Sequence, residues 1–207
     1  MFKYRLYPSK KQEQVIEEQF ELCRQTYNFL LAHCRETYKQ TKKRPSYYDL
    51  TKLLPHLKNS GDYNIVYSQV LQNVSKRIKD GYIGFFVRRK AGLKAGLPRF
   101  KKYGTYKSIT YPQFGFKIQG NKLKLSKIGV LRINLHRKIR GQVKTLTIKR
   151  NASGKWYACF SCVIETEHMK KPFKAVGIDV GLKSFAVLSD ETVIDNPRHY
   201  RNSETTR

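Results

Sequence analysis

The chain has 207 residues, of which 40% are hydrophobic and 13% aromatic, enough to form one large folded domain or two modest ones. Its 42 Lys and Arg residues outnumber 15 Asp and Glu, and this net charge of +27 favours a polyanionic partner, because each neutralised phosphate releases condensed counterions. The sequence contains no long apolar run, signal peptide or lipidation motif, so we expect a cytoplasmic, nucleoid-associated protein that does not bind membranes.

The first predicted elements are a short strand and a long helix. Large apolar or aromatic residues alternate with basic ones from Phe2 to Tyr7, the period of a half-buried strand, and Pro8 ends it. Ser9 and Gln12 then have the spacing of a capping box at a helix start. Apolar residues three or four apart predict an amphipathic helix that buries Ile16, Phe20, Cys23, Tyr27, Leu30, Cys34 and Tyr38.

A second amphipathic helix is predicted over residues 65–89, after a polar stretch that contains Pro45 and Pro55. Its apolar stripe consists of Val70, Val74, Ile78, Gly81 with Tyr82, and Phe85. The opposite side carries Gln69, Gln72, Asn73 and Lys76. Solvation is the commoner reason for such a polar face, but amides and a lysine also suit base edges and phosphates. We therefore take these four residues as candidate nucleic-acid contacts.

A basic, glycine-containing linker over residues 91–102 follows this helix. Three cations lie at the end of this helix and three more at the end of the linker. We take all six, together with Arg5 of the first strand, as candidate phosphate contacts. These six are Arg88, Arg89, Lys90, Arg99, Lys101 and Lys102.

Short alternating segments fill the region from residue 105 to 165 and predict antiparallel strands of a small β-barrel. They span residues 106–111, 114–119, 122–126, 130–135, 143–150 and 155–164. Because an isolated strand is unstable, we expect the N-terminal strand to pair with this region. Lys and Arg interleave with aromatic residues here, a mixture that binds single-stranded nucleic acids, although each aromatic residue suits a barrel core equally well.

The predicted fold class is therefore α+β, in three parts. Residues 1–8 and 97–170 form an antiparallel β-barrel, residues 9–96 form a helical insertion in it, and residues 171–207 begin a further domain. The first 172 residues hold 37 of the basic and 10 of the acidic side chains, so the whole net charge lies there. A basic segment followed by a neutral one indicates a part that binds polyanions, joined to the start of a further domain.

Four cysteines predict no disulfide framework in a chain of this kind. Cys159 and Cys162 have the spacing of half a zinc knuckle, but they lie in a predicted strand, where residues three apart face opposite sides. Cys23 and Cys34 are expected to point into a core.

The neutral tail carries a carboxylate in an apolar setting. Asp179 lies in one apolar strand, a second follows Gly181 over residues 184–189, and a third segment spans residues 191–195. A buried carboxylate is costly unless a charge such as a metal ion compensates it, so the pattern favours the first hairpin of an RNase H-like fold and a two-metal phosphodiester site. Alternatively, Asp179 caps the turn at Gly181, or the hairpin is that of an actin-like ATPase or sugar kinase. The basic region argues against a kinase.

Taken in order, these segments resemble the TnpB (OrfB) proteins of insertion sequences, relatives of the type V CRISPR nucleases. The resemblance covers nearly the whole chain and is centred on residues 177–183, which match the RuvC-I motif of that family. The other matching segments are residues 3–8, 27–31, 97–102, 120–125, 128–129 and 155–157.

The resemblance implies a wedge-like barrel interrupted by a helical recognition domain and followed by a RuvC nuclease domain. Asp179 would then be a catalytic residue and a Mg²⁺ ligand. The implied partners are a guide RNA transcribed from the transposon end and a double-stranded target DNA, with the protein reading a short adjacent motif and base pairing reading the rest. The helix with Gln69, Gln72, Asn73 and Lys76 is the expected reader of that motif.

The sequence departs from the family after Asp179. The later glutamate and second aspartate of a RuvC site are missing, and so is the zinc module with two C-x-x-C pairs. The chain matches the family to about residue 201 and then ends, as a truncated member would. One carboxylate cannot hold two Mg²⁺ ions for in-line attack, so we expect no cleavage by this chain alone.

Two other functions remain open from the sequence. One is a nuclease-dead regulator that binds transposon-end RNA or target DNA, and the other is a general RNA-binding structural protein that uses no guide. RNA that copurifies with the chain would distinguish them, because the structural protein predicts bulk ribosomal RNA, whereas the regulator and the truncated nuclease predict one discrete species.

Overall fold

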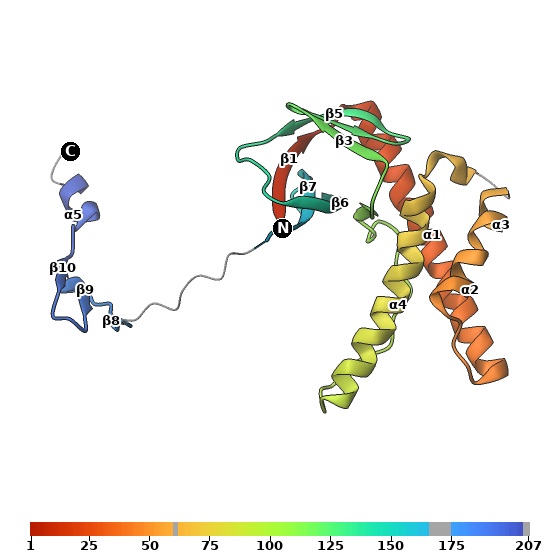
Figure 1. The fold of residues 1–207 in the computed structure, drawn as a ribbon, viewed down its shortest axis with the longest axis horizontal. Helices are drawn as coiled ribbons and strands as arrows, with labels where there is room; N and C mark the ends of the chain where they lie inside the picture. Colours follow the sequence, from red (N-terminus) through yellow and green to blue (C-terminus); the bar gives the residue numbers. More distant parts are fainter. Residues whose placement is uncertain (60–61, 166–174, 205–207) are drawn as a thin grey trace. The chain divides into compact units, whose positions relative to one another are not determined.

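A computed structural model describes residues 1–59, 62–165 and 175–204 of the chain (Figure 1). These residues belong to two units, residues 1–165 and residues 166–207. The predicted domain boundaries at residues 8/9 and 96/97 lie inside the first unit and stay predictions, and the boundary at 170/171 lies outside the described residues.

Seven antiparallel strands form one sheet in the first unit, which curls nearly into a barrel (Figure 1). β1 lies between β7 and β5, with Leu6 opposite Trp156 on one side and Ile133 on the other, so the predicted pairing of the N-terminal strand is confirmed. The sheet order is β2-β6-β7-β1-β5-β4-β3. The strands are β1 (Phe2–Tyr7), β2 (Ser108–Tyr111), β3 (Phe116–Gln119), β4 (Lys122–Leu125), β5 (Gly129–Asn134), β6 (Gln142–Arg150) and β7 (Trp156–Val163).

Alternation along these strands separates an apolar inside from a basic outside. In β1, Tyr4 and Leu6 are buried while Lys3 is exposed. The same alternation in β4 buries Leu123 and leaves Lys122 exposed. Successive side chains of a strand point to opposite faces, so the sequence pattern alone fixes which residues face outward.

A single long helix, α1 (Lys10–Thr41), follows β1 and begins at the predicted capping box, in which Ser9 and Gln12 exchange side-chain to backbone hydrogen bonds. Its buried face consists of Ile16, Gln19, Phe20, Cys23, Thr26, Tyr27, Leu30, Leu31 and Cys34. Tyr38 was predicted on the same face but is 55% exposed, because at this end of the helix it borders an open cleft.

The polar stretch predicted between the two long helices is itself largely helical. It contains α2 (Tyr47–Lys52), α3 (Leu54–Asn59) and the 3-10 turn η1 (Asp62–Ile65). Ser46 and Asp49 form a second capping box, and Pro55 lies in the first turn of α3, where its missing N–H costs no hydrogen bond. Helix α4 (Ser68–Lys90) then starts three residues later than the predicted residue 65.

The helices and the barrel share one hydrophobic core. Gln19 lies fully buried between them, and its Nε2 donates to the carbonyl oxygens of Ile65 at 2.9 Å and Lys127 at 3.4 Å. Cys23 and Cys34 are buried in this core as predicted. Cys159 and Cys162 both lie in β7, and Cys162 packs against the core.

The second unit contains a small antiparallel sheet of order β10-β9-β8 and a short helix. The elements are β8 (Ile178–Asp179), β9 (Ser184–Leu188), β10 (Val193–Asp195) and α5 (His199–Glu204). The mixture of helix and sheet agrees with the predicted α+β class, and an RNase H-like domain stays a prediction. No helix in the described part of the chain is long and apolar enough to cross a membrane.

Candidate nucleic-acid interface

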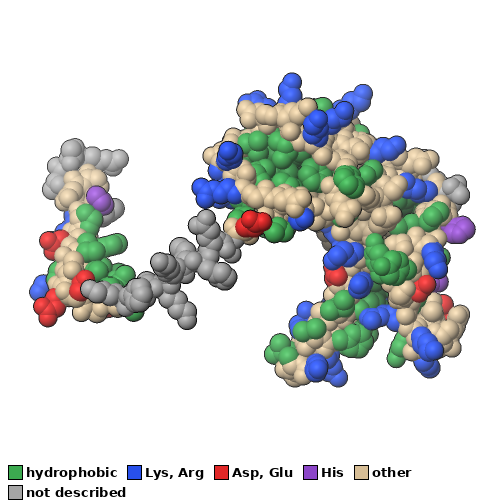
Figure 2. Space-filling view, viewed as in Figure 1, with side chains coloured by type: hydrophobic (Ala, Val, Ile, Leu, Met, Phe, Trp, Pro, Cys, Tyr) green, Lys and Arg blue, Asp and Glu red, His purple; other side chains and the backbone are tan. Residues whose placement is uncertain are grey.

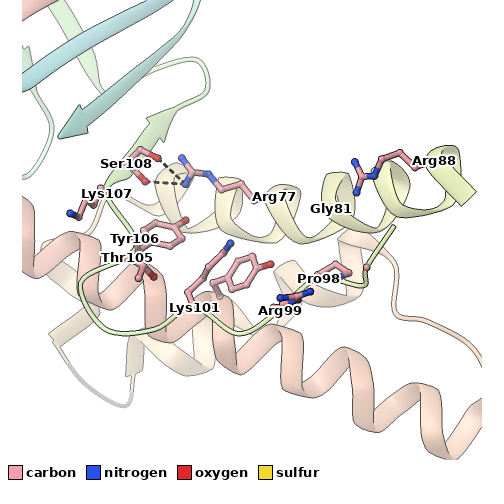
Figure 3. Close-up of a pocket in the computed structure, with 12 residues that line it drawn as sticks. Arg77, Gly81, Arg88, Pro98, Arg99, Lys101, Thr105, Tyr106, Lys107 and Ser108 are labelled. Atoms are coloured by element: carbon pink, nitrogen blue, oxygen red, sulfur yellow. Dashed lines mark hydrogen bonds between the residues drawn. The ribbon is translucent and has the colours of Figure 1, made fainter. Parts of the chain in front are cut away.

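A basic groove of about 500 Å³ lies between α1, α4 and the chain that connects α4 to β2 (Figure 3). Five of its lining residues are cationic and none is acidic. We call it the basic groove. Its lining residues are Tyr27, Arg77, Gly81, Arg88, Gly96, Pro98, Arg99, Lys101, Thr105, Tyr106, Lys107 and Ser108.

Helix α1 fixes the connecting chain through hydrogen bonds to its backbone. The Asn28 amide accepts from the Lys101 N–H at 2.8 Å and donates to the Lys101 carbonyl at 3.0 Å, and Arg24 donates to the same carbonyl at 2.9 Å. Arg35 donates to the Pro98 carbonyl at 3.0 Å. These bonds use side chains of α1 to hold the backbone of the irregular segment that carries Arg99 and Lys101.

Arg77 joins α4 to the barrel at one end of the basic groove (Figure 3). Its guanidinium donates to the Ser108 carbonyl at 3.0 Å, the Ser108 Oγ at 3.3 Å and the Thr110 Oγ1 at 3.1 Å, and it lies 5.1 Å from the Tyr106 ring. The sequence-based choice of residues missed it, since its partners lie 31 and 33 residues away. One local signal was present, because Asn73 stands one turn before it and accepts from its Nε.

The predicted polar face of α4 divides into residues that contact the rest of the protein and residues that point to solvent. Gln69 Oε1 accepts from the Phe114 N–H at 3.3 Å, and Asn73 Oδ1 accepts from Arg77 at 3.2 Å, so both serve contacts within the protein. Gln72 is exposed, and Lys76 is exposed with an ion pair of 2.6 Å to Asp80. Gln72 and Lys76 are therefore the members of this face that point to solvent.

The six predicted cations after the polar face also separate. Arg88, Arg99 and Lys101 line the basic groove. Arg89 and Lys90 are exposed in the last turn of α4, and Lys102 is exposed in the connecting chain. The structure thus brings three of the six together with Arg77 and Lys107.

Arg5 belongs to a different surface, the outer face of the barrel. Lys3 Nζ lies 4.1 Å from the Tyr157 ring, and the Arg5 guanidinium lies 5.4 Å from that ring and 5.5 Å from the Tyr7 ring. Arg132 lies 5.7 Å from Tyr7 on the other side. Cations and aromatic rings thus alternate across β7, β1 and β5, as in surfaces that contact both phosphates and bases.

Acidic side chains are largely kept out of these surfaces. Residues 81–164, which include every strand of the barrel except β1, contain no Asp or Glu. Acids of α1 instead make contacts within the unit: Glu13 accepts from Trp156 Nε1 at 2.8 Å, and Glu17 pairs with Arg150. Figure 2 shows Lys and Arg side chains around the barrel and along the helices of this unit, with few acids among them.

Asp179 lies in β8 of the second unit, opposite Val187 of β9. The prediction assumed a buried strand, but Asp179 is exposed and its neighbours Ile178 and Val180 are 65% and 69% exposed. The desolvation argument for a bound metal therefore does not apply to this strand, because three short strands do not cover it.

The comparisons with known proteins agree with one another. A family model described as a helix-turn-helix domain, HTH_OrfB_IS605, matches residues 1–43. The "Putative RNA-guided DNA endonuclease InsQ" of Escherichia coli (strain K12) is 30% identical over 209 residues, covering 98% of this chain and 50% of that protein. A "Putative RNA-guided DNA endonuclease" of Streptomyces pristinaespiralis is 27% identical over 207 residues, covering 97% and 50%. Over nearly its whole length the chain is thus similar to proteins of the TnpB/OrfB family.

Two features of the chain limit what this similarity implies. The chain spans about half the length of the curated relatives it matches. In addition, the residues matched by the helix-turn-helix model contain the strand β1 and the single helix α1, so two helices joined by a turn are not found within residues 1–43.

The family site for Mg²⁺ is not assembled by the residues of the described segments. Within residues 1–59, 62–165 and 175–204, no three His, Cys, Asp or Glu side chains lie close enough together to hold a metal ion. Mg²⁺ keeps several water ligands and often takes only one or two carboxylates, but a two-metal centre needs further protein ligands to hold both ions in place. Asp179 alone thus does not fit a two-metal centre.

Proposed function

We propose that this chain is a transposon-associated nucleic-acid-binding protein that binds a guide RNA and a double-stranded target DNA without cutting the DNA by itself. The basic groove carries the proposal, because five cations converge there with no carboxylate among the lining residues. The relatives named as RNA-guided DNA endonucleases support the same partners. Phosphate contacts of this kind supply affinity without sequence specificity.

The test compares two triple variants with equal loss of charge. Arg88→Ala, Arg99→Ala and Lys101→Ala together remove three cations of the basic groove, whereas Lys10→Ala, Lys11→Ala and Lys52→Ala remove three exposed cations elsewhere. We expect the groove variant to lower the affinity for transposon-end RNA and to reduce the slope of log K against log salt by about 2–3, since each lost phosphate contact removes roughly one unit. Equal effects of the two variants would contradict the role of the groove.

The absence of cleavage is tested separately. Incubation of the chain with guide RNA, matched duplex and Mg²⁺ is expected to leave the DNA intact, because Asp179 belongs to no group of three His, Cys, Asp or Glu side chains among the described residues that could hold a metal ion. Mg²⁺-dependent nicking that disappears in Asp179→Ala would show that the chain is an active nuclease. Sequencing of copurifying RNA decides the remaining point, because a discrete transposon-end RNA supports the proposal and bulk ribosomal RNA opposes it.

A further inference from the structure

A second cleft, of about 580 Å³, lies beside the C-terminal halves of α1 and α4, and we call it the tip cleft. Tyr38, Tyr82, Phe85 and Phe86 give it an aromatic lining, to which Leu97 of the connecting chain also belongs. The neighbouring basic groove is lined by different residues throughout. None of the site residues predicted from the sequence belongs to the tip cleft.

Aromatic surface in the tip cleft is open to solvent. Tyr38 is 55% and Phe86 is 54% exposed, whereas Tyr82 is only 9% exposed and forms part of the floor. Cys34 is also at the floor, and burial raises the pKa of its thiol to about 11, so the floor is uncharged at neutral pH. Rings held in this way offer flat apolar faces at little conformational cost.

The rim of the tip cleft is cationic. Arg35, Lys39 and Arg44 line it, and no acidic residue does. The Arg44 guanidinium lies 4.6 Å from the Tyr82 ring and 5.3 Å from the Phe86 ring. Lys39 has a long, exposed ion pair of 4.0 Å with Glu36, which contributes little and leaves the ammonium available.

We propose that the tip cleft binds an unpaired nucleobase of a single-stranded segment, with the adjoining phosphate held by Arg44 and Lys39. An apolar peptide would match the rings but would bring no anion to the cationic rim, whereas a nucleotide matches both. A base inside a duplex already stacks on its neighbours, so only an unpaired base presents a face to Phe86. The inference rests on the proposed nucleic-acid binding and adds a preference for single strands at a defined place.

The experiment measures binding of matched single-stranded and double-stranded oligonucleotides to the full chain and to two variants. Phe86→Ala removes a ring of the tip cleft, and Phe29→Ala removes a ring that is 46% exposed on α1 and lines none of these clefts. We expect Phe86→Ala to weaken single-strand binding about 10-fold, as loss of one stacked base does, and to leave duplex binding unchanged, while Phe29→Ala changes neither. Phe86→Trp should restore the affinity, because it keeps an aromatic face.

A fluorescent base separates failure of the inference from failure of the proposed function. An oligonucleotide that contains 2-aminopurine should lose fluorescence on binding to the wild-type chain and to Phe86→Trp but not to Phe86→Ala. If the wild-type chain binds neither oligonucleotide, the proposed function is wrong. If it binds both, but Phe86→Ala and Phe29→Ala behave alike, or Phe86→Ala weakens duplex binding equally, only the tip cleft has been wrongly assigned.

Discussion

Side chains that look equivalent in the sequence have different roles on α4. Gln69 and Gln72 are both amides on the predicted polar face, three residues apart. Gln69 accepts from the Phe114 N–H in the connection between β2 and β3, while Gln72 is exposed. The spacing in the sequence does not separate the two, because residues three apart share one face of a helix.

This difference predicts that alanine at Gln69 affects stability, whereas alanine at Gln72 affects binding. Gln69→Ala should lower the free energy of unfolding by about 0.5–1 kcal/mol, because the Phe114 N–H loses its partner, and Gln72→Ala should change it by less than about 0.5 kcal/mol. Urea unfolding measures both. Gln72→Ala should instead weaken binding to a duplex that carries the adjacent motif more than to a scrambled duplex, and equal loss on the two duplexes would reduce Gln72 to a general contact.

The long elements are joined by a small number of polar side chains. α1 is tied to the barrel by Glu13 and Glu17 and to the connecting chain by Asn28, while α4 is tied to β2 by Arg77. Glu21 orients Arg24 toward that connecting chain, and the Arg24 hydrogen bonds hold the pKa of the Glu21 carboxyl below its ordinary value. Polar residues of one element thus position the backbone of another, and the basic groove forms between them.

Arg77 should therefore matter for stability as well as for binding. Arg77→Met keeps an unbranched apolar stem but removes the donors to Ser108 and Thr110, and we expect it to lower the free energy of unfolding by about 2 kcal/mol. Lys76→Met on the same helix is the control and should cost about 0.5 kcal/mol or less, since its ion pair with Asp80 is exposed. Similar unfolding midpoints in urea for the two variants would show that Arg77 does not join the elements.

At the scale of the whole molecule, basic, acidic and buried side chains occupy different places. The cations lie on the outside of the barrel and in the connecting chain, whereas the acids of α1 make contacts within the unit. The core beneath is continuous from helices to barrel and includes ionisable groups such as Cys23, Tyr106 and Tyr111. Burial raises the pKa of all three, and that of Cys23 to about 12.

This core predicts that the chain loses stability at high pH. In the unfolded chain the Cys23 thiol ionises near its ordinary pKa of 9.0, whereas in the folded chain it stays protonated until about pH 12. The contribution of the Cys23 thiol to the free energy of unfolding is therefore complete below pH 9.0. It falls by about 1 kcal/mol per pH unit as the pH rises toward 12. Urea unfolding between pH 7 and pH 10.5 measures the decline.

The matched variants for this prediction are Cys23→Ala and Cys162→Ala. Cys23→Ala should reduce the slope of stability against pH above pH 9, although it lowers stability overall by leaving a small void. Cys162→Ala should keep most of the slope, because Cys162 is less buried than Cys23. Identical slopes in the wild-type chain and Cys23→Ala would contradict the assignment.

Local patterns in the sequence were sufficient for the elements themselves. Alternation between Phe2 and Tyr7 predicted β1, the Ser9 and Gln12 pair predicted the start of α1, and the later alternating segments predicted the strands of the barrel. These predictions succeeded because alternation, helical spacing and capping depend on residues within about one or two turns of each other. The segment around Pro55 was missed because short helices such as α3 have little periodicity.

The sequence by itself determined that the chain is basic and that β1 needs partners in the later strands, and it located the resemblance to a family motif at residues 177–183, around Asp179. Only the tertiary structure decided which cations lie together, because Arg77, Arg88, Arg99 and Lys101 line one groove that is held by contacts spanning up to 77 residues. It also showed that Gln69 and Asn73 are anchored and that Asp179 is exposed. Convergence and burial depend on which elements pack together, and a linear pattern does not contain that information.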